Sequence, residues 1–120
     1  MAEVAFPRTP LVPDRNIRTL LDTTNATDVL TWTPAVTGLF LLVLSLNVKT
    51  AATDVTVSVS YTDPDTGATT VTLVNDVSEP VGITPVNGVI TAQAGQAITV
   101  SVTAGTANQV RVAGALLELR

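Results

Sequence analysis

Side chains that commonly perform catalysis are scarce in this 120-residue chain. It has no histidine and no cysteine, and Lys49 is its only lysine. A nucleophilic triad needs a base such as histidine or lysine, and thiol chemistry needs a cysteine. We therefore expect no catalytic residues, no cofactor and no bound metal, and we predict that the protein is not an enzyme.

The ten carboxylates fall mostly between the predicted strands. Asp63 and Asp65 lie close enough in sequence to suggest calcium, but calcium takes about six to eight oxygen ligands, and no further acidic residues follow at the required spacing. The segment has instead the chemistry of a turn, because Pro64 fixes φ early and Gly67 allows a positive φ at the end. We interpret residues 63–67 as a hairpin turn.

Charge and composition restrict the partners. The net charge of −4 argues against nucleic acid. Only 13% of the residues are charged, so either the surface is covered by uncharged polar residues or much of it is buried in an assembly. The N-terminus lacks the pattern of a signal peptide, and the longest apolar run is shorter than the ~20 residues of a membrane helix. We expect neither nucleic acid nor a membrane as a partner.

The longest apolar run, residues 38–48, is predicted to be a strand that is apolar on both faces. Side chains alternate between the faces of a strand, which divides the run into two sets. One set is Leu39, Leu41 and Val43, and the other is Phe40, Leu42, Leu44, Leu46 and Val48. The final strand, residues 109–119, is also apolar on both faces. We expect the two strands to lie in one sheet, with the bulkier Phe40 set in the core.

The rest of the chain indicates an all-β domain. Thr and Val make up about a third of the residues, and both favour strands. Residues 75–88 are predicted to be a loop that crosses from one sheet to the other. Further strands are predicted at 17–21, 29–33, 55–62, 69–74, 89–93 and 97–103. About eight short strands separated by turns predict an antiparallel β-sandwich or barrel over residues 17–120.

Residues 1–16 are predicted to be an extended arm. Three prolines within seven residues, at positions 7, 10 and 13, exclude a helix and a central strand. The arm also carries apolar residues and arginines, which suit docking on a partner; a disordered terminus is the other interpretation. The residues assigned to partner binding are Val4, Phe6, Arg8, Leu11 and Val12.

A subunit interface is predicted because two strands carry more apolar surface than one domain core needs. Closed point-group symmetry is the usual result of such self-association, and composition alone does not separate a trimer from a dimer. The residues assigned to this interface are Leu39, Leu41, Val43, Val110, Val112 and Leu116.

Three parts of the chain resemble small structural proteins of tailed bacteriophages: the proline-rich arm, TGLFLLVLSLNVKTAATDVTVSVSYTDPDTGATTVTLVN and ITAQAGQAITVSVTAGTANQVRVAGALLELR. The resemblance covers roughly residues 28–120. It implies a jelly-roll sandwich related in shape to the tumour-necrosis-factor trimers. It also implies a homotrimer, used in capsid decoration (cement) proteins or in fibre and tail modules. One departure is Val110-Arg111-Val112, where a tyrosine is often found.

Our first hypothesis is therefore a homotrimeric capsid decoration protein that stabilises the capsid through its base and N-terminal arm. It would be made in the host cytoplasm and lie on the outer capsid surface of the virion, against the major capsid protein and neighbouring decoration subunits. The alternative is a receptor- or carbohydrate-binding module of a phage fibre or tail. Sugar sites usually offer exposed aromatic platforms, whereas Trp32 is expected to be a buried anchor.

Overall fold

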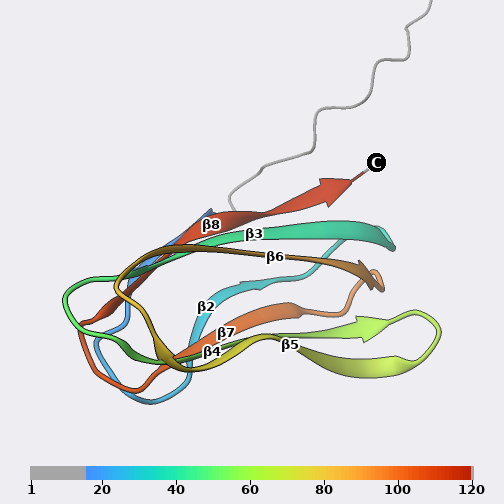
Figure 1. Cartoon of the computed structure of the whole chain (residues 1–120). Coiled ribbons are helices and arrows are strands. Elements are labelled where there is room, and N and C mark those ends of the chain that lie inside the picture. The colour runs from blue at the N-terminus through green and yellow to red at the C-terminus, as the bar shows by residue number, and fades with distance from the viewer. Residues whose placement is uncertain (1–15, 120) are drawn as a thin grey trace, which may run out of the picture.

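A computed structural model describes residues 16–119, which form eight strands in two antiparallel sheets (Figure 1). The strands are β1 (Asn16–Leu20), β2 (Thr27–Trp32), β3 (Gly38–Val48), β4 (Thr53–Asp63), β5 (Gly67–Glu79), β6 (Gly82–Ala92), β7 (Ile98–Ala104) and β8 (Val110–Leu119). The predicted all-β sandwich of about eight strands is confirmed. Within residues 16–119 there is no helix that could cross a membrane.

The strand order is that of a jelly roll. Sheet A has the order β1-β8-β3-β6 and sheet B the order β2-β7-β4-β5. The pairs are nested along the chain, since β1 pairs with β8, β2 with β7, β3 with β6 and β4 with β5. This nesting is the double Greek key of a jelly roll. Figure 1 shows the two sheets as stacked layers, with connecting loops at both ends.

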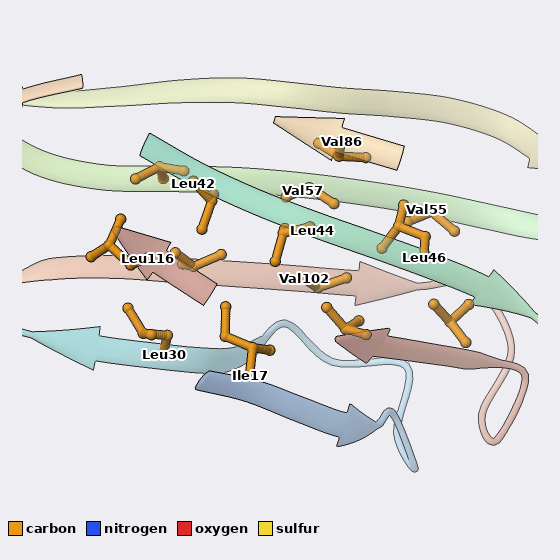
Figure 2. Close-up of a cluster of buried hydrophobic side chains, with 14 of the residues drawn as sticks. Ile17, Leu30, Leu42, Leu44, Leu46, Val55, Val57, Val86, Val102 and Leu116 are labelled. Atoms are coloured by element: carbon orange, nitrogen blue, oxygen red, sulfur yellow. The ribbon is translucent and has the colours of Figure 1, made fainter. Parts of the chain in front are cut away.

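The core lies between the sheets and is built from alternate residues of the strands (Figure 2). In β3 the Phe40 set is buried throughout, from Phe40 at 0% exposure to Leu44 at 3%. Phe40 also meets Trp32 edge to face, with ring centroids 5.6 Å apart. Burying one large apolar side chain stabilises the fold by about 1.5–3 kcal/mol. The prediction that the Phe40 set faces the core is confirmed.

The segment 75–88, predicted to be a loop, is mostly strand. Its first five residues continue β5 to Glu79, and β6 begins at Gly82, so only Pro80 and Val81 remain between them. The reason lies in the topology, because β5 and β6 are edge strands. An edge strand tolerates proline and glycine, and Pro85 pairs with Ser45 in this setting. The crossing from sheet B to sheet A does occur here, as expected.

Two further predictions bear on local structure. The Asp63 carboxylate oxygen Oδ1 accepts hydrogen bonds from the backbone N–H groups of Asp65 at 2.8 Å and Thr66 at 3.1 Å. This confirms the turn interpretation of residues 63–67, which join β4 to β5. At the other end of the domain, Asn16 already pairs with Ala115, so β1 begins one residue before the predicted boundary.

Candidate interaction surface

The outer faces of the two sheets differ in chemistry. On the two central strands of sheet B, most residues that alternate with the core carry hydroxyl groups, whereas Val77 on the edge strand β5 is exposed. In β4 and β7 the hydroxyl residues are Thr56, Ser58, Ser60, Thr99, Ser101 and Thr103. Hydroxyl side chains can hydrogen-bond to water, so this face is suited to solvent.

On sheet A, cross-strand partners line up in rows across the outer face. The first row joins Thr91, Leu39 and Leu119, the second joins Val89, Leu41 and Leu117, and the third joins Asn87, Val43 and Ala115. The fourth row joins Pro85, Ser45, Ala113 and Arg18, and the fifth joins Ile83, Asn47, Arg111 and Leu20. Leucine and valine therefore gather where β3 begins and β8 ends, whereas Asn47 and Arg111 occupy the two central strands at the opposite end.

We call the apolar end of this face the outer patch. Its members are Leu39, Leu41, Val43, Val89, Leu117 and Leu119. Leu39 is 47% exposed, Val43 is 37% exposed and Val89 is 61% exposed, and the other three are partly exposed. A contiguous exposed apolar area on a small domain commonly marks a contact with another molecule.

Next to the outer patch, the sheet carries a shallow hollow of about 370 Å³, which we call the central hollow. It is lined by Val43, Leu44, Ser45, Ala113, Gly114 and Ala115. Alternation along the strands places the side chains of Val43, Ser45, Ala113 and Ala115 outward, so the backbone of Leu44 and Gly114 forms the floor. The run Ala113-Gly114-Ala115 has small side chains, which leaves room above β8.

The predicted interface residues are divided by the structure. Leu39, Leu41 and Val43 lie together on the outer face, and their role in an interface stays a prediction. The assignment of the β8 residues is wrong, because they are at most 1% exposed within a single chain. These are Val110, Val112 and Leu116. The pairing explains the error, since Leu116 is the partner of Leu42 and therefore shares its inward face.

The outward residues of β8 were not chosen from the sequence. They are Arg111, Ala113, Ala115, Leu117 and Leu119, and Leu117 pairs with Leu41. Both faces of β8 are apolar, so alternation alone could not tell which one is outside. The predicted arm residues Val4, Phe6, Arg8, Leu11 and Val12 lie outside the described residues.

One buried carboxylate was also missed. Glu79, at the end of β5, is 3% exposed. Its Oε2 accepts a hydrogen bond from the Thr84 hydroxyl at 2.8 Å, while Oε1 has no hydrogen-bond partner within residues 16–119. Asp76, which can hydrogen-bond only to the protonated acid, raises the pKa of Glu79; burial adds to this, and the Thr84 hydroxyl acts in the opposite direction. No group of three or more acidic, histidine or cysteine side chains in the described part of the chain could hold a metal.

Trp32 is not an open aromatic platform. It is half-buried at the end of β2 and packs against the core through Phe40. Tyr61 likewise packs against the core from β4. The aromatic side chains among residues 16–119 therefore contribute mainly to packing against the core, and less to contacts on the exposed surface.

Comparison with known proteins identifies the fold. No family model matches the chain, and no curated protein matches it in sequence. A chain from the structure of infectious bursal disease virus Gx strain superposes over 92% of this chain with a TM-score of 0.57 and 14% sequence identity. The present chain spans 32% of that viral chain. At this identity the likeness shows a shared fold.

Proposed function

We propose that this protein is a non-enzymatic structural component of a virion, and specifically a homotrimeric capsid decoration protein. In this role the outer face of sheet A forms the contact between subunits. The N-terminal arm and the base of the trimer bind the major capsid protein and neighbouring decoration subunits on the outer capsid surface.

The contrast between the two outer faces carries this proposal. The central strands β4 and β7 of sheet B present hydroxyl groups to solvent, whereas the outer patch on sheet A presents Leu39, Val43 and Val89. Burial of apolar surface contributes about 25 cal/mol per Å² before the costs of association, so covering the outer patch favours self-association. A closed ring of copies covers it in every subunit at once.

Two other observations support a virion setting. The jelly roll is shared with a chain from a virus structure, and the sequence resembles small structural proteins of tailed bacteriophages. Jelly rolls occur in viral capsid domains and in lectins, so the fold agrees with both the decoration role and the carbohydrate-binding alternative. The half-buried Trp32 favours the decoration role.

The proposed mechanism is multivalent attachment. Each arm brings apolar residues such as Phe6 and the positive charge of Arg8 to a partner. Once one arm of a trimer is bound, the other two arms are held near their own binding sites. This raises the overall affinity well above that of one arm.

Co-sedimentation with purified capsids of the source virus tests this function. The full chain is expected to pellet with capsids, while a variant lacking residues 1–15 is expected to stay in the supernatant as a trimer. Unchanged binding by the shortened variant would remove the arm from the mechanism. If the full chain fails to bind capsids and a glycan array gives clear hits, the carbohydrate-binding alternative is favoured.

A further inference from the structure

We propose that the central hollow is the docking site for residues Leu11 and Val12 of the same chain. This inference concerns the isolated protein and does not depend on capsid binding. Docking at this site would anchor the arm on sheet A and leave its first residues, including Phe6, to bind a partner.

The place where the chain enters the structure is the first argument. Asn16 pairs with Ala115, which lines the central hollow. Neighbouring strands are about 4.8 Å apart, so the centre of the hollow, between β8 and β3, lies about 7 Å from β1. The arm therefore begins beside the hollow.

The direction of the chain is the second argument. β1 runs antiparallel to β8, so the N-terminal end of β1 at Asn16 points toward the end of β8 that carries Leu117 and Leu119. Among the described residues, no strand pairs with this last part of β8 on the β1 side. Pro13 has no backbone N–H, so it cannot donate a ladder hydrogen bond to β8.

The reach and the chemistry of the arm agree with the site. Val12 is four residues before Asn16 and Leu11 is five before it, which allows about 13–17 Å of extended chain. That span exceeds the distance to the hollow and leaves length for a reversal at Pro13. Leucine and valine match a hollow whose lining is apolar apart from Ser45.

Tethering favours the chain's own arm over the arm of another copy. A short covalent connection gives an effective concentration of about the millimolar range, which exceeds a micromolar concentration of other copies. A second copy remains free to cover the outer patch at Leu39 and Leu119, which lie two rows away from the hollow.

Thiol labelling tests the proposal, because the chain has no cysteine of its own. Ser45→Cys places a thiol in the hollow, and the full chain carrying it is compared with the same chain carrying Leu11→Asn and Val12→Asn. We expect labelling to be about tenfold faster in the arm variant, the ratio that 1.4 kcal/mol of docking free energy gives. Thr72→Cys, exposed on β5, is the control whose rate should not change.

Disulfide trapping identifies which chain supplies the arm. The pair Leu11→Cys and Ser45→Cys should close within one chain and run at the mass of a single chain without reductant. The matched pair Leu11→Cys and Thr72→Cys should not close. Equal labelling rates with and without the arm substitutions would overturn the proposal, as would a disulfide that forms only between chains.

Discussion

Gly114 lies opposite Leu44 in the β3–β8 pair, and the two backbones approach so closely that no side chain fits at position 114. A Cβ atom there would collide with the Val43 carbonyl oxygen and lie 2.9 Å from the Leu44 Cα. Gly114 also has a φ of +153°, a conformation that glycine adopts more readily than other residues. This glycine therefore forms the floor of the central hollow and fixes the approach of β8 to β3.

Gly114→Ala should destabilise the fold by about 1–3 kcal/mol or more, because the added methyl group has to push two strands apart. Chemical denaturation measures the loss. Gly38→Ala is the matched control, since no atom lies within 4 Å of a Cβ built at Gly38 and that residue starts the neighbouring strand. Equal midpoints for the two variants would show that β8 can relax away from β3.

The fold could be predicted where burial leaves a clear pattern. Val55, Val57 and Val59 alternate with hydroxyl residues because one face of β4 meets the core and the other meets water. The same argument holds for Ile98–Ala104. The end of β5 and the first part of β6 escaped prediction, because Pro85 and neighbouring turn residues are acceptable where one side of a strand is unpaired.

The candidate site could be predicted only in part. Alternation places Leu39, Leu41 and Val43 on one face of β3, and the bulk of the Phe40 set indicates that the other face is the core side. In β8 the two faces have similar hydrophobicity, so the outward side depended on register. The pairing of Leu42 with Leu116 is a long-range contact that no local pattern contains. Burial of Glu79 likewise depends on how β5 meets β6.

Charged substitutions should separate the two faces of β3. Leu42→Asp places a charge in the core and should prevent folding, because an unpaired buried charge is very costly. Leu41→Asp, one residue away, points outward and should retain the β-sheet circular dichroism spectrum while weakening self-association. Thermal melts and light scattering compare the two variants. A folded Leu42→Asp variant or a fully assembled Leu41→Asp variant would contradict this assignment of faces.

Glu79 should make stability depend on pH. Asp76 and burial hold the pKa of Glu79 above its ordinary value of 4.5, so the folded chain binds the extra proton more tightly than the unfolded chain. The stability from this proton is therefore present below pH 4.5 and lost as the pH rises through the raised pKa. Glu79→Gln should flatten this dependence and stabilise the fold at pH 7 by about 1 kcal/mol, since its amide can donate to Asp76.

Denaturation of both proteins between pH 4 and pH 8 measures this effect. Asp28→Asn is the control, because it removes one negative charge at an exposed position of β2. Its unfolding free energy should change with pH as steeply as that of the wild-type protein. Parallel pH curves for the wild-type protein and Glu79→Gln would show that the raised pKa does not couple to folding.

Sedimentation at micromolar concentration tests most directly whether the outer patch joins subunits. The wild-type protein is expected to sediment as a single species of about 37 kDa, which is three copies of the 12.4 kDa chain. A double variant, Leu39→Asp with Leu117→Asp, should shift to the mass of one folded chain. A wild-type protein that sediments as a stable 12.4 kDa monomer would contradict the proposed trimer and the role of the outer patch in it.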